Sequence, residues 1–160
     1  MFAQSPFQNK VDEGIKVSTS ADIIFVADMF VEDYVGGAEL TTEALIESSP
    51  FNIQKIHSRD VTMEMLESGV EKYWIFGNYS SLDVNLYPSI VGNLDYSILE
   101  YDYKYCTWRS PDKHASIDGT PCDCELSDHG KMVSALMYGA KSICGCQKNN
   151  KNTIIHYFHF

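Results

Sequence analysis

Short runs of apolar residues, most of them β-branched or aromatic, recur along this chain and are separated by segments with helical spacing. The run at 23–26 (Ile-Ile-Phe-Val) is continuous, which is typical of a strand buried on both faces of a parallel sheet. Similar runs at 51–57, 73–76, 96–99 and 141–144 predict four more strands. This alternation predicts right-handed βαβ units and the α/β fold class, with a Rossmann-like three-layer parallel sheet.

Four helices are expected between these strands. Capping residues and apolar spacing place them at 37–48, 60–69 and 127–139, and a weaker one, interrupted by a proline, at 81–91. The stretch 101–126 is rich in proline, glycine, cysteine and charged residues, so it is expected to be irregular.

Composition and charge exclude several classes of protein. The 160 residues are enough for about one domain, and 44% of them are hydrophobic, enough for a core. Acidic residues outnumber basic ones 22 to 12, which argues against nucleic-acid binding and adhesion to anionic membranes. No run approaches the roughly 18 apolar residues of a transmembrane segment, and the start lacks a signal-peptide pattern. We therefore expect a cytoplasmic protein with reduced cysteines.

The chain divides into three parts by composition. Residues 1–20 are a polar arm, residues 21–146 form the α/β domain, and residues 147–160 are an atypical tail or truncated linker. The tail ends in the aromatic run 157–160, for which the predicted domain offers no cover. We expect this end to be disordered or to pack against a second copy, which would make a homodimer.

A glycine pair, Gly36-Gly37, stands directly before the helix predicted at 37–48. Bare backbone N–H groups at the start of a helix, with no Cβ in the way, favour an anion or phosphate site. The alternative is that the pair only forms a turn.

Several common phosphate and nucleophile motifs are missing from the chain. No G-x-G-x-x-G follows the first predicted strand, and there is no P-loop and no G-x-S-x-G. A nicotinamide-dependent enzyme, a P-loop nucleotidase and an α/β-hydrolase are therefore not expected. A D-x-D motif, the metal-binding motif of one glycosyltransferase fold, is also missing.

Two stretches resemble family 4 glycosyltransferases. Residues 21–45 read ADIIFVADMFVEDYVGGAELTTEAL, an opening strand, a loop and a G-G-A-E helix start. Residues 96–106 read YSILEYDYKYC and are followed by Arg109-Ser110-Pro111 and His114, which is similar to a viral and microbial branch of such enzymes.

The resemblance implies one half of a GT-B architecture, in which the reaction takes place between two Rossmann-like domains. This chain would supply only the amino-terminal domain, which mainly holds the acceptor, and the missing second domain would bind the nucleotide sugar. The family's retaining chemistry requires no metal cofactor. Its E-x7-E motif belongs to the second domain, so the pair Glu39 and Glu47 is instead expected on the solvated face of its helix.

Candidate site residues follow the predicted strands, because ligands bind at the carboxyl ends of a parallel sheet. By resemblance, Gly36 and Gly37 would lie against donor phosphate or acceptor, and Asp102 would lie near the transferred sugar. Its carboxylate would accept a hydrogen bond from a hydroxyl or act as a base, or it would only cap a loop. Three further residues are candidates for substrate binding, each with a purely structural alternative (an Asx-turn, or a surface ion pair for the last two): Asn78, Glu100 and Arg109.

Cys106, Cys122, Cys124 and His129 form a C-x15-C-x-C-x4-H series within the stretch expected to be irregular. Three thiolates and an imidazole suit tetrahedral zinc, and a loop with few apolar residues would be stabilised by a structural metal. His114 competes as the fourth ligand, and reduced thiols packed in a loop are the alternative.

Three functions fit the sequence. The first is a glycosyltransferase acceptor-side domain with a nucleotide sugar and a carbohydrate acceptor as partners. The second is a non-enzymatic flavodoxin-like module that binds a phosphate-bearing ligand, and the third is a zinc-stapled interaction domain.

Overall fold

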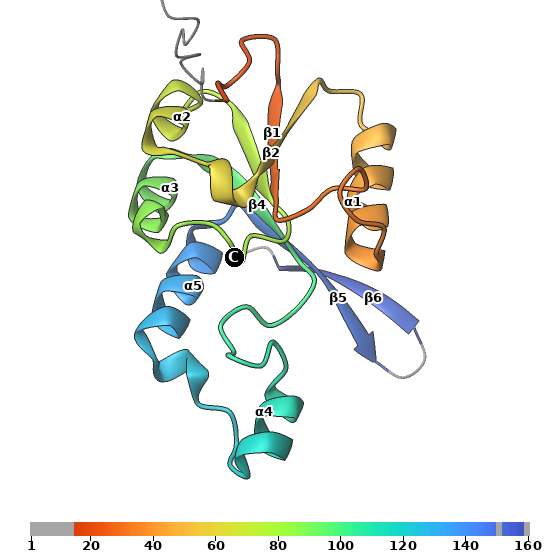
Figure 1. Ribbon diagram of the computed structural model, residues 1–160, viewed down its shortest axis with the longest axis vertical. Helices are drawn as coiled ribbons and strands as arrows, with labels where there is room; N and C mark the ends of the chain where they lie inside the picture. Colours follow the sequence, from red (N-terminus) through yellow and green to blue (C-terminus); the bar gives the residue numbers. More distant parts are fainter. Residues whose placement is uncertain (1–14, 150–151, 159–160) are drawn as a thin grey trace, which may run out of the picture.

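The computed structural model describes residues 15–149 and 152–158, and its centre is a six-stranded sheet (Figure 1). The strands are β1 (Ile23–Ala27), β2 (Ile53–His57), β3 (Tyr73–Phe76), β4 (Asp95–Glu100), β5 (Ser142–Asn149) and β6 (Asn152–Phe158). Their order in space is 2-1-3-4-5-6; the first five are parallel and β6 runs antiparallel to β5. The predicted α/β class with a Rossmann-like parallel sheet is confirmed.

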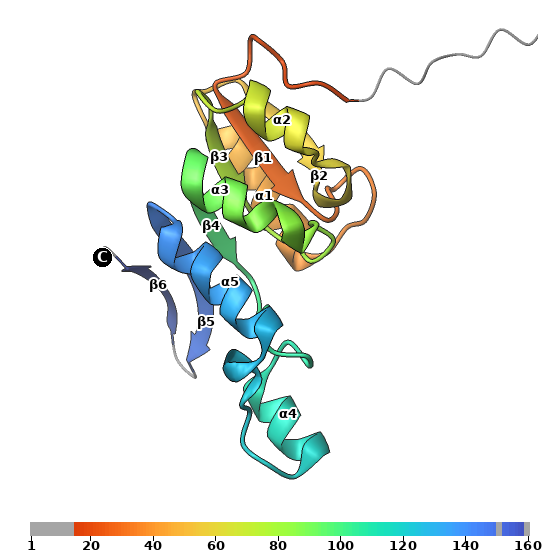
Figure 2. The ribbon, with the colours of Figure 1, turned by 90° about the vertical axis from the view of Figure 1, so that its left-hand side faces the viewer.

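Helices cover both faces of the sheet, which gives three layers (Figures 1 and 2). The α-helices are α1 (Gly37–Ser48), α2 (Met63–Ser68), α3 (Tyr87–Asn93), α4 (Pro111–Asp118) and α5 (Asp128–Gly139), with three short 3-10 helices, η1 (Ser58–Asp60), η2 (Val84–Leu86) and η3 (Cys124–Leu126). Helices α2, α3 and α5 lie on one face over the larger apolar cluster. Helix α1 lies on the other face, over a smaller cluster built on Phe25, Phe30 and Leu99.

Helix α1 turns a different face to the sheet from the one its apolar residues predict. Glu39 and Thr42 are buried, whereas Leu45 is 47% exposed. The prediction that Glu39 lies on the solvated face is wrong, while Glu47 is exposed as expected. The inward stripe is partly polar because Thr42 meets the Tyr101 hydroxyl, with 2.8 Å between the two oxygens.

The stretch expected to be irregular contains helix α4, so that prediction is wrong for residues 111–118. The helix has complete end signals: the Ser110 hydroxyl accepts from the Lys113 N–H, Pro111 occupies the first turn, and Gly119 ends it with φ of +71°. It carries no apolar face, and its one buried residue is His114. The spacing of apolar residues could not predict this helix, because the residue that it buries is a histidine.

The tail forms part of the sheet. Residues 152–158 pair with β5, which continues to Asn149, beyond the predicted end of that strand. We expected disorder or packing on a second copy, and the described tail residues pair with their own sheet instead; a homodimer stays a prediction. Residues 1–14 of the predicted polar arm lie outside the described residues. None of the helices described is both long and apolar enough to cross a membrane.

Two helical glycines give a matched test of the packing. A Cβ on Gly130 of α5 would overlap the Cys124 carbonyl oxygen and lie 2.7 Å from Glu125 Cα, whereas a Cβ on Gly92 of α3 would meet nothing within 4 Å. We expect Gly130→Ala to lower the free energy of unfolding by about 2–3 kcal/mol, because backbone atoms of η3 cannot move aside locally. Gly92→Ala should raise it by about 0.5–1 kcal/mol through helix propensity. Urea denaturation measures both, and equal effects would contradict the packing of α5 on η3.

Candidate functional site

The carboxyl ends of β1, β3 and β4 meet at one edge of the sheet, and Asp28 lies at its centre. The chain leaves β1 toward β2 on one side and returns as β3 on the other, which is where α/β sheets open a crevice. The Asp28 carboxylate accepts from the backbone N–H groups of Ser80 and Ser81, both at 2.9 Å, and from the hydroxyl of Ser58. One side chain thus ties the loop after β3 to the ends of β1 and β2.

The environment of Asp28 favours its charged form. Burial of the carboxylate raises its pKa, but the hydrogen bonds from Ser58, Ser81 and Ser80 together lower it more. The pKa of Asp28 is therefore below its ordinary value. The carboxylate is an ionised anchor at neutral pH.

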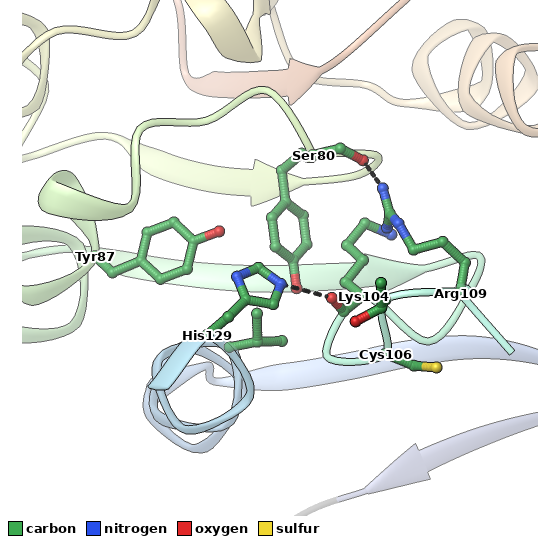
Figure 3. Close-up of a pocket in the computed structure, with 9 residues that line it drawn as sticks. Ser80, Tyr87, Lys104, Cys106, Arg109 and His129 are labelled. Atoms are coloured by element: carbon green, nitrogen blue, oxygen red, sulfur yellow. Dashed lines mark hydrogen bonds between the residues drawn. The ribbon is translucent and has the colours of Figure 1, made fainter. Parts of the chain in front are cut away.

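A cavity of about 170 Å³ opens beside this anchor, and Figure 3 shows its lining. The residues around it come from the loops after β3 and β4 and from α3 and α5; they include Ser80, Tyr87, Lys104, Cys106, Arg109 and His129. Arg109 points toward Ser80, and its Nη2 donates to the Ser80 hydroxyl. The cavity therefore bridges two loops that follow neighbouring strands.

Four charged side chains form a cluster, and two of them, Lys104 and Arg109, line this cavity. Lys104 is buried, and its Nζ lies 3.0 Å from Asp102 Oδ1 and 3.8 Å from Glu100 Oε1. Arg109 Nη1 lies 2.9 Å from the same Asp102 oxygen. Two cations and two carboxyl groups balance, so the cluster offers donors and acceptors with little net charge.

Two buried polar atoms near the cluster have no hydrogen-bond partner among the described residues, Tyr79 Oη and Glu100 Oε2. Burial, followed by the nearby carboxylate of Glu100, raises the pKa of Tyr79, which therefore stays a neutral phenol. Burial also raises the pKa of Glu100, against the charge of Lys104. Unpaired buried polar groups are costly, so these two atoms indicate room for a polar ligand or water.

The structure brings three of the predicted strand-end residues together. Glu100, Asp102 and Arg109 belong to the cluster. The ion-pair alternative joined Arg109 to Glu100, whereas in the structure Arg109 pairs with Asp102. Asn78 lies next to the cavity and acts locally: its backbone carbonyl accepts from the Asp28 N–H and its side-chain oxygen lies 3.4 Å from the Ser80 hydroxyl. The roles of these residues in substrate binding stay predictions.

The glycine pair does not line this cavity. A Cβ on Gly36 would lie 2.5 Å from Glu39 Oε2 and 2.8 Å from Tyr34 Cε1, so a larger residue here would make these two side chains shift. Gly37 faces open space. The buried Glu39 carboxylate already lies at this helix start, where it takes advantage of the positive end of the helix dipole. An anion site at Gly36 and Gly37 stays a prediction.

A second cluster lies beyond the sheet edge, where Cys106, His114, Cys122 and Cys124 converge. Their ligand atoms all lie within 4.8 Å of one another. Cys106 Sγ is 3.6 Å from Cys122 Sγ and 3.9 Å from His114 Nδ1, and Cys124 Sγ is 3.3 Å from the same nitrogen. Such a Cys3His cluster can bind a structural zinc ion.

The prediction of His129 as the fourth ligand is wrong, because the fourth member of the cluster is His114. His129 lies at the start of α5 and its Nε2 is 3.0 Å from the carbonyl oxygen of Lys104, on the cavity side. Helix α4 carries His114 into the cluster because it places that residue on its buried side. The spacing favoured His129 because the helix around His114 was not predicted.

Groups around the Cys3His cluster orient its members. His114 Nε2 lies 3.4 Å from Asp118 Oδ2, which also accepts from the Trp108 indole N–H at 3.2 Å. A carboxylate on the far nitrogen of a histidine is the usual partner of a metal-binding imidazole. Hydrogen bonds from the backbone and hydroxyl of Thr107 lower the pKa of the Cys124 thiol.

Sequence reasoning missed Asp28, Ser80, Lys104 and Tyr87 as site residues. Asp28 and Ser80 each stand within a few residues of the end of a predicted strand, which was the available signal. Lys104 gave no signal, because a lysine between tyrosines reads as exposed and is buried only through its carboxylate partners.

Comparisons of this chain with models of known protein families, with curated proteins and with solved structures find no match.

The anchoring role of Asp28 predicts a pH-dependent loss of stability. Asp28→Asn keeps the shape but turns one acceptor oxygen into an NH2 group facing a backbone N–H, and we expect the free energy of unfolding at pH 7 to fall by about 2 kcal/mol. Because the pKa is lowered in the folded state, this contribution is complete above the unfolded-chain pKa of about 3.9. It is lost as the pH falls through the lower folded-state pKa, so the two proteins should converge in acid.

Urea denaturation at pH 7 and at intervals down to pH 3 measures this difference. Asp95→Asn is the matched control, since the Asp95–Lys141 pair is exposed and contributes about 0–1 kcal/mol. If Asp28→Asn costs no more than Asp95→Asn at pH 7, the carboxylate is not an anchor.

Proposed function

We propose that this chain is the acceptor-side domain of a glycosyltransferase, and that the cavity at the carboxyl edge of its sheet holds a sugar. The observation that carries the proposal is a polar cavity lined by Lys104 and Arg109, whose charges are balanced by their ion-pair partners Asp102 and Glu100. The resemblance of residues 21–45 and 96–106 to family 4 glycosyltransferases supports it from the sequence side.

The charge balance favours a hydroxyl-rich ligand over a simple anion. Each hydroxyl of a sugar both donates and accepts, so it matches a cavity lined by hydroxyl groups and by two cations that carboxylates behind them already neutralise. A bare phosphate would have to displace Asp102 from both cations. Tyr87 lies at the opposite side of the cavity from Arg109 and turns its hydroxyl toward the other lining residues (Figure 3), so it adds one more group that can donate to or accept from a sugar hydroxyl.

Asp102 is the residue that we place nearest to the transferred sugar. Both cations contact its Oδ1, so a bound sugar hydroxyl would reach the carboxylate at Oδ2. The cations hold the carboxylate in one orientation, which is what a group that positions an acceptor hydroxyl requires.

We also propose that the Cys3His cluster holds a structural zinc ion. Zn–S bonds of about 2.3 Å and Zn–N bonds of about 2.0–2.1 Å, arranged as a tetrahedron, imply S–S edges of about 3.8 Å and S–N edges of about 3.6 Å. Three of the six separations within the cluster, from 3.3 to 3.9 Å, fit those edges, and all six are within 4.8 Å. The Asp118 carboxylate on His114 supports the same conclusion.

Sugar binding can be tested with two arginine variants. Arg109 has φ of +57°, and asparagine tolerates that backbone well, so Arg109→Asn should keep the fold while removing the guanidinium. We expect saturation-transfer NMR to detect the sugar protons of a simple acceptor-type glycoside, methyl glucoside or methyl mannoside, on the parent protein, and this signal to fall about tenfold or more in Arg109→Asn, the scale set by loss of a charged hydrogen bond. Arg59, which is exposed and distant in sequence, supplies the control Arg59→Asn, which should bind as the parent does. Equal signals from the two variants would contradict the assignment of the cavity.

The identity of the fourth metal ligand gives a separate prediction. With cobalt(II) as a spectroscopic substitute for zinc, the parent and His129→Asn should show the charge-transfer absorption of a tetrahedral thiolate site with one metal per chain. His114→Asn should lose tight binding, since three ligands hold the metal less well than four. If His129→Asn instead abolishes binding, the ligand set is wrong.

A further inference from the structure

A single loop connects the two clusters. The loop after β4, residues 101–110, carries Lys104 and Arg109 of the cavity with their ion-pair partner Asp102, and Cys106 of the Cys3His cluster lies between the two cations. We infer that the metal at Cys106, His114, Cys122 and Cys124 shapes the sugar-binding cavity, so that ligand binding depends on zinc. This inference rests on the proposed zinc and on the proposed use of the cavity.

Cys106 belongs both to the cavity lining and to the Cys3His cluster. It lines the cavity, while its sulfur points away from the Tyr87 and His129 rings (Figure 3). Its backbone N–H donates to the Tyr103 carbonyl and its carbonyl accepts from the Arg109 N–H, each at 2.9 Å. A metal bond to this sulfur would therefore fix the turn that presents Arg109.

The conformation of Arg109 needs such support. Its φ of +57° is a left-handed conformation that costs a non-glycine residue roughly 1 kcal/mol or more. Such backbone persists only where surrounding contacts determine it. Two of those contacts come from the side chain, since the guanidinium binds Asp102 and Ser80. The third comes from the backbone, where the Arg109 N–H donates to the carbonyl of the proposed metal ligand Cys106.

The hydrophobic core gives this loop little alternative anchorage. Cys106 and Cys124 are buried, yet neither belongs to the two apolar clusters that hold the sheet together. Within the loop, Tyr101 and Tyr105 pack at the margins of those clusters, while Tyr103 and Trp108 are exposed. Loss of the metal should therefore loosen the cavity while the sheet remains folded.

The experiment compares zinc-loaded protein with protein stripped by a chelator under reducing conditions, and with Cys122→Ser. Cys122 is a cluster ligand that does not line the cavity, and Cys144→Ser, which alters a thiol in β5 outside the cluster, is the control. Hydrogen exchange of peptide 101–110 reports on the loop without any ligand, and saturation transfer to methyl glucoside and methyl mannoside reports on the cavity. Far-UV circular dichroism reports on the sheet.

We expect metal-free protein and Cys122→Ser to keep most of their circular dichroism, to exchange peptide 101–110 about tenfold faster or more, and to lose the ligand signal in parallel. Readdition of zinc should restore the parent but not Cys122→Ser, and Cys144→Ser should behave as the parent throughout. Unchanged exchange after metal removal, or no zinc bound at all, would overturn the inference. Faster exchange after metal removal, with no ligand signal from either the zinc-loaded or the metal-free protein, would support the shaping of the loop by zinc and refute the proposed sugar. Faster exchange with an unchanged ligand signal would overturn the dependence of binding on zinc.

Discussion

The pairing of β1 along both of its edges is the constraint on which the rest of the structure depends. Its backbone bonds to β2 and β3, and its side chains alternate between the two apolar clusters, with Ile24 and Val26 on one face and Phe25 on the other. Because both neighbours run parallel to it, the ends of three strands are brought to one edge. Asp28 is the next residue along the chain, and its ionised carboxylate joins the loops at that edge.

The site lies where the apolar core ends. At the carboxyl end of β4 the chain buries Lys104 beside the half-buried Glu100, and Lys104 is stable there because it faces Glu100 and Asp102. Removal of one partner would leave a buried charge without compensation. The cavity is therefore held by polar contacts, which specify geometry more sharply than apolar packing does and fail more completely when one is lost.

The long connection between β4 and α5 uses a different stabilising device. It buries few apolar side chains, and helix α4 turns only His114 inward. Three thiols and this imidazole take the place that a hydrophobic cluster occupies elsewhere in the domain. Since one of those thiols belongs to the loop that carries Asp102 and Arg109, the stability of this connection and the shape of the cavity are linked by the covalent chain.

Local sequence by itself determined the strands and their parallel pairing, because continuous β-branched runs separated by helical segments allow few other arrangements. It also placed Glu100, Asp102 and Arg109 at a strand end and marked three of the four members of the Cys3His cluster. Only the tertiary structure decided that His114 and not His129 completes that cluster, that Glu39 is buried, and that residues 152–158 add an antiparallel strand. Those outcomes depend on contacts between residues that are distant in the chain. Periodicity and spacing are local patterns, so they predict helices and strands but not such contacts.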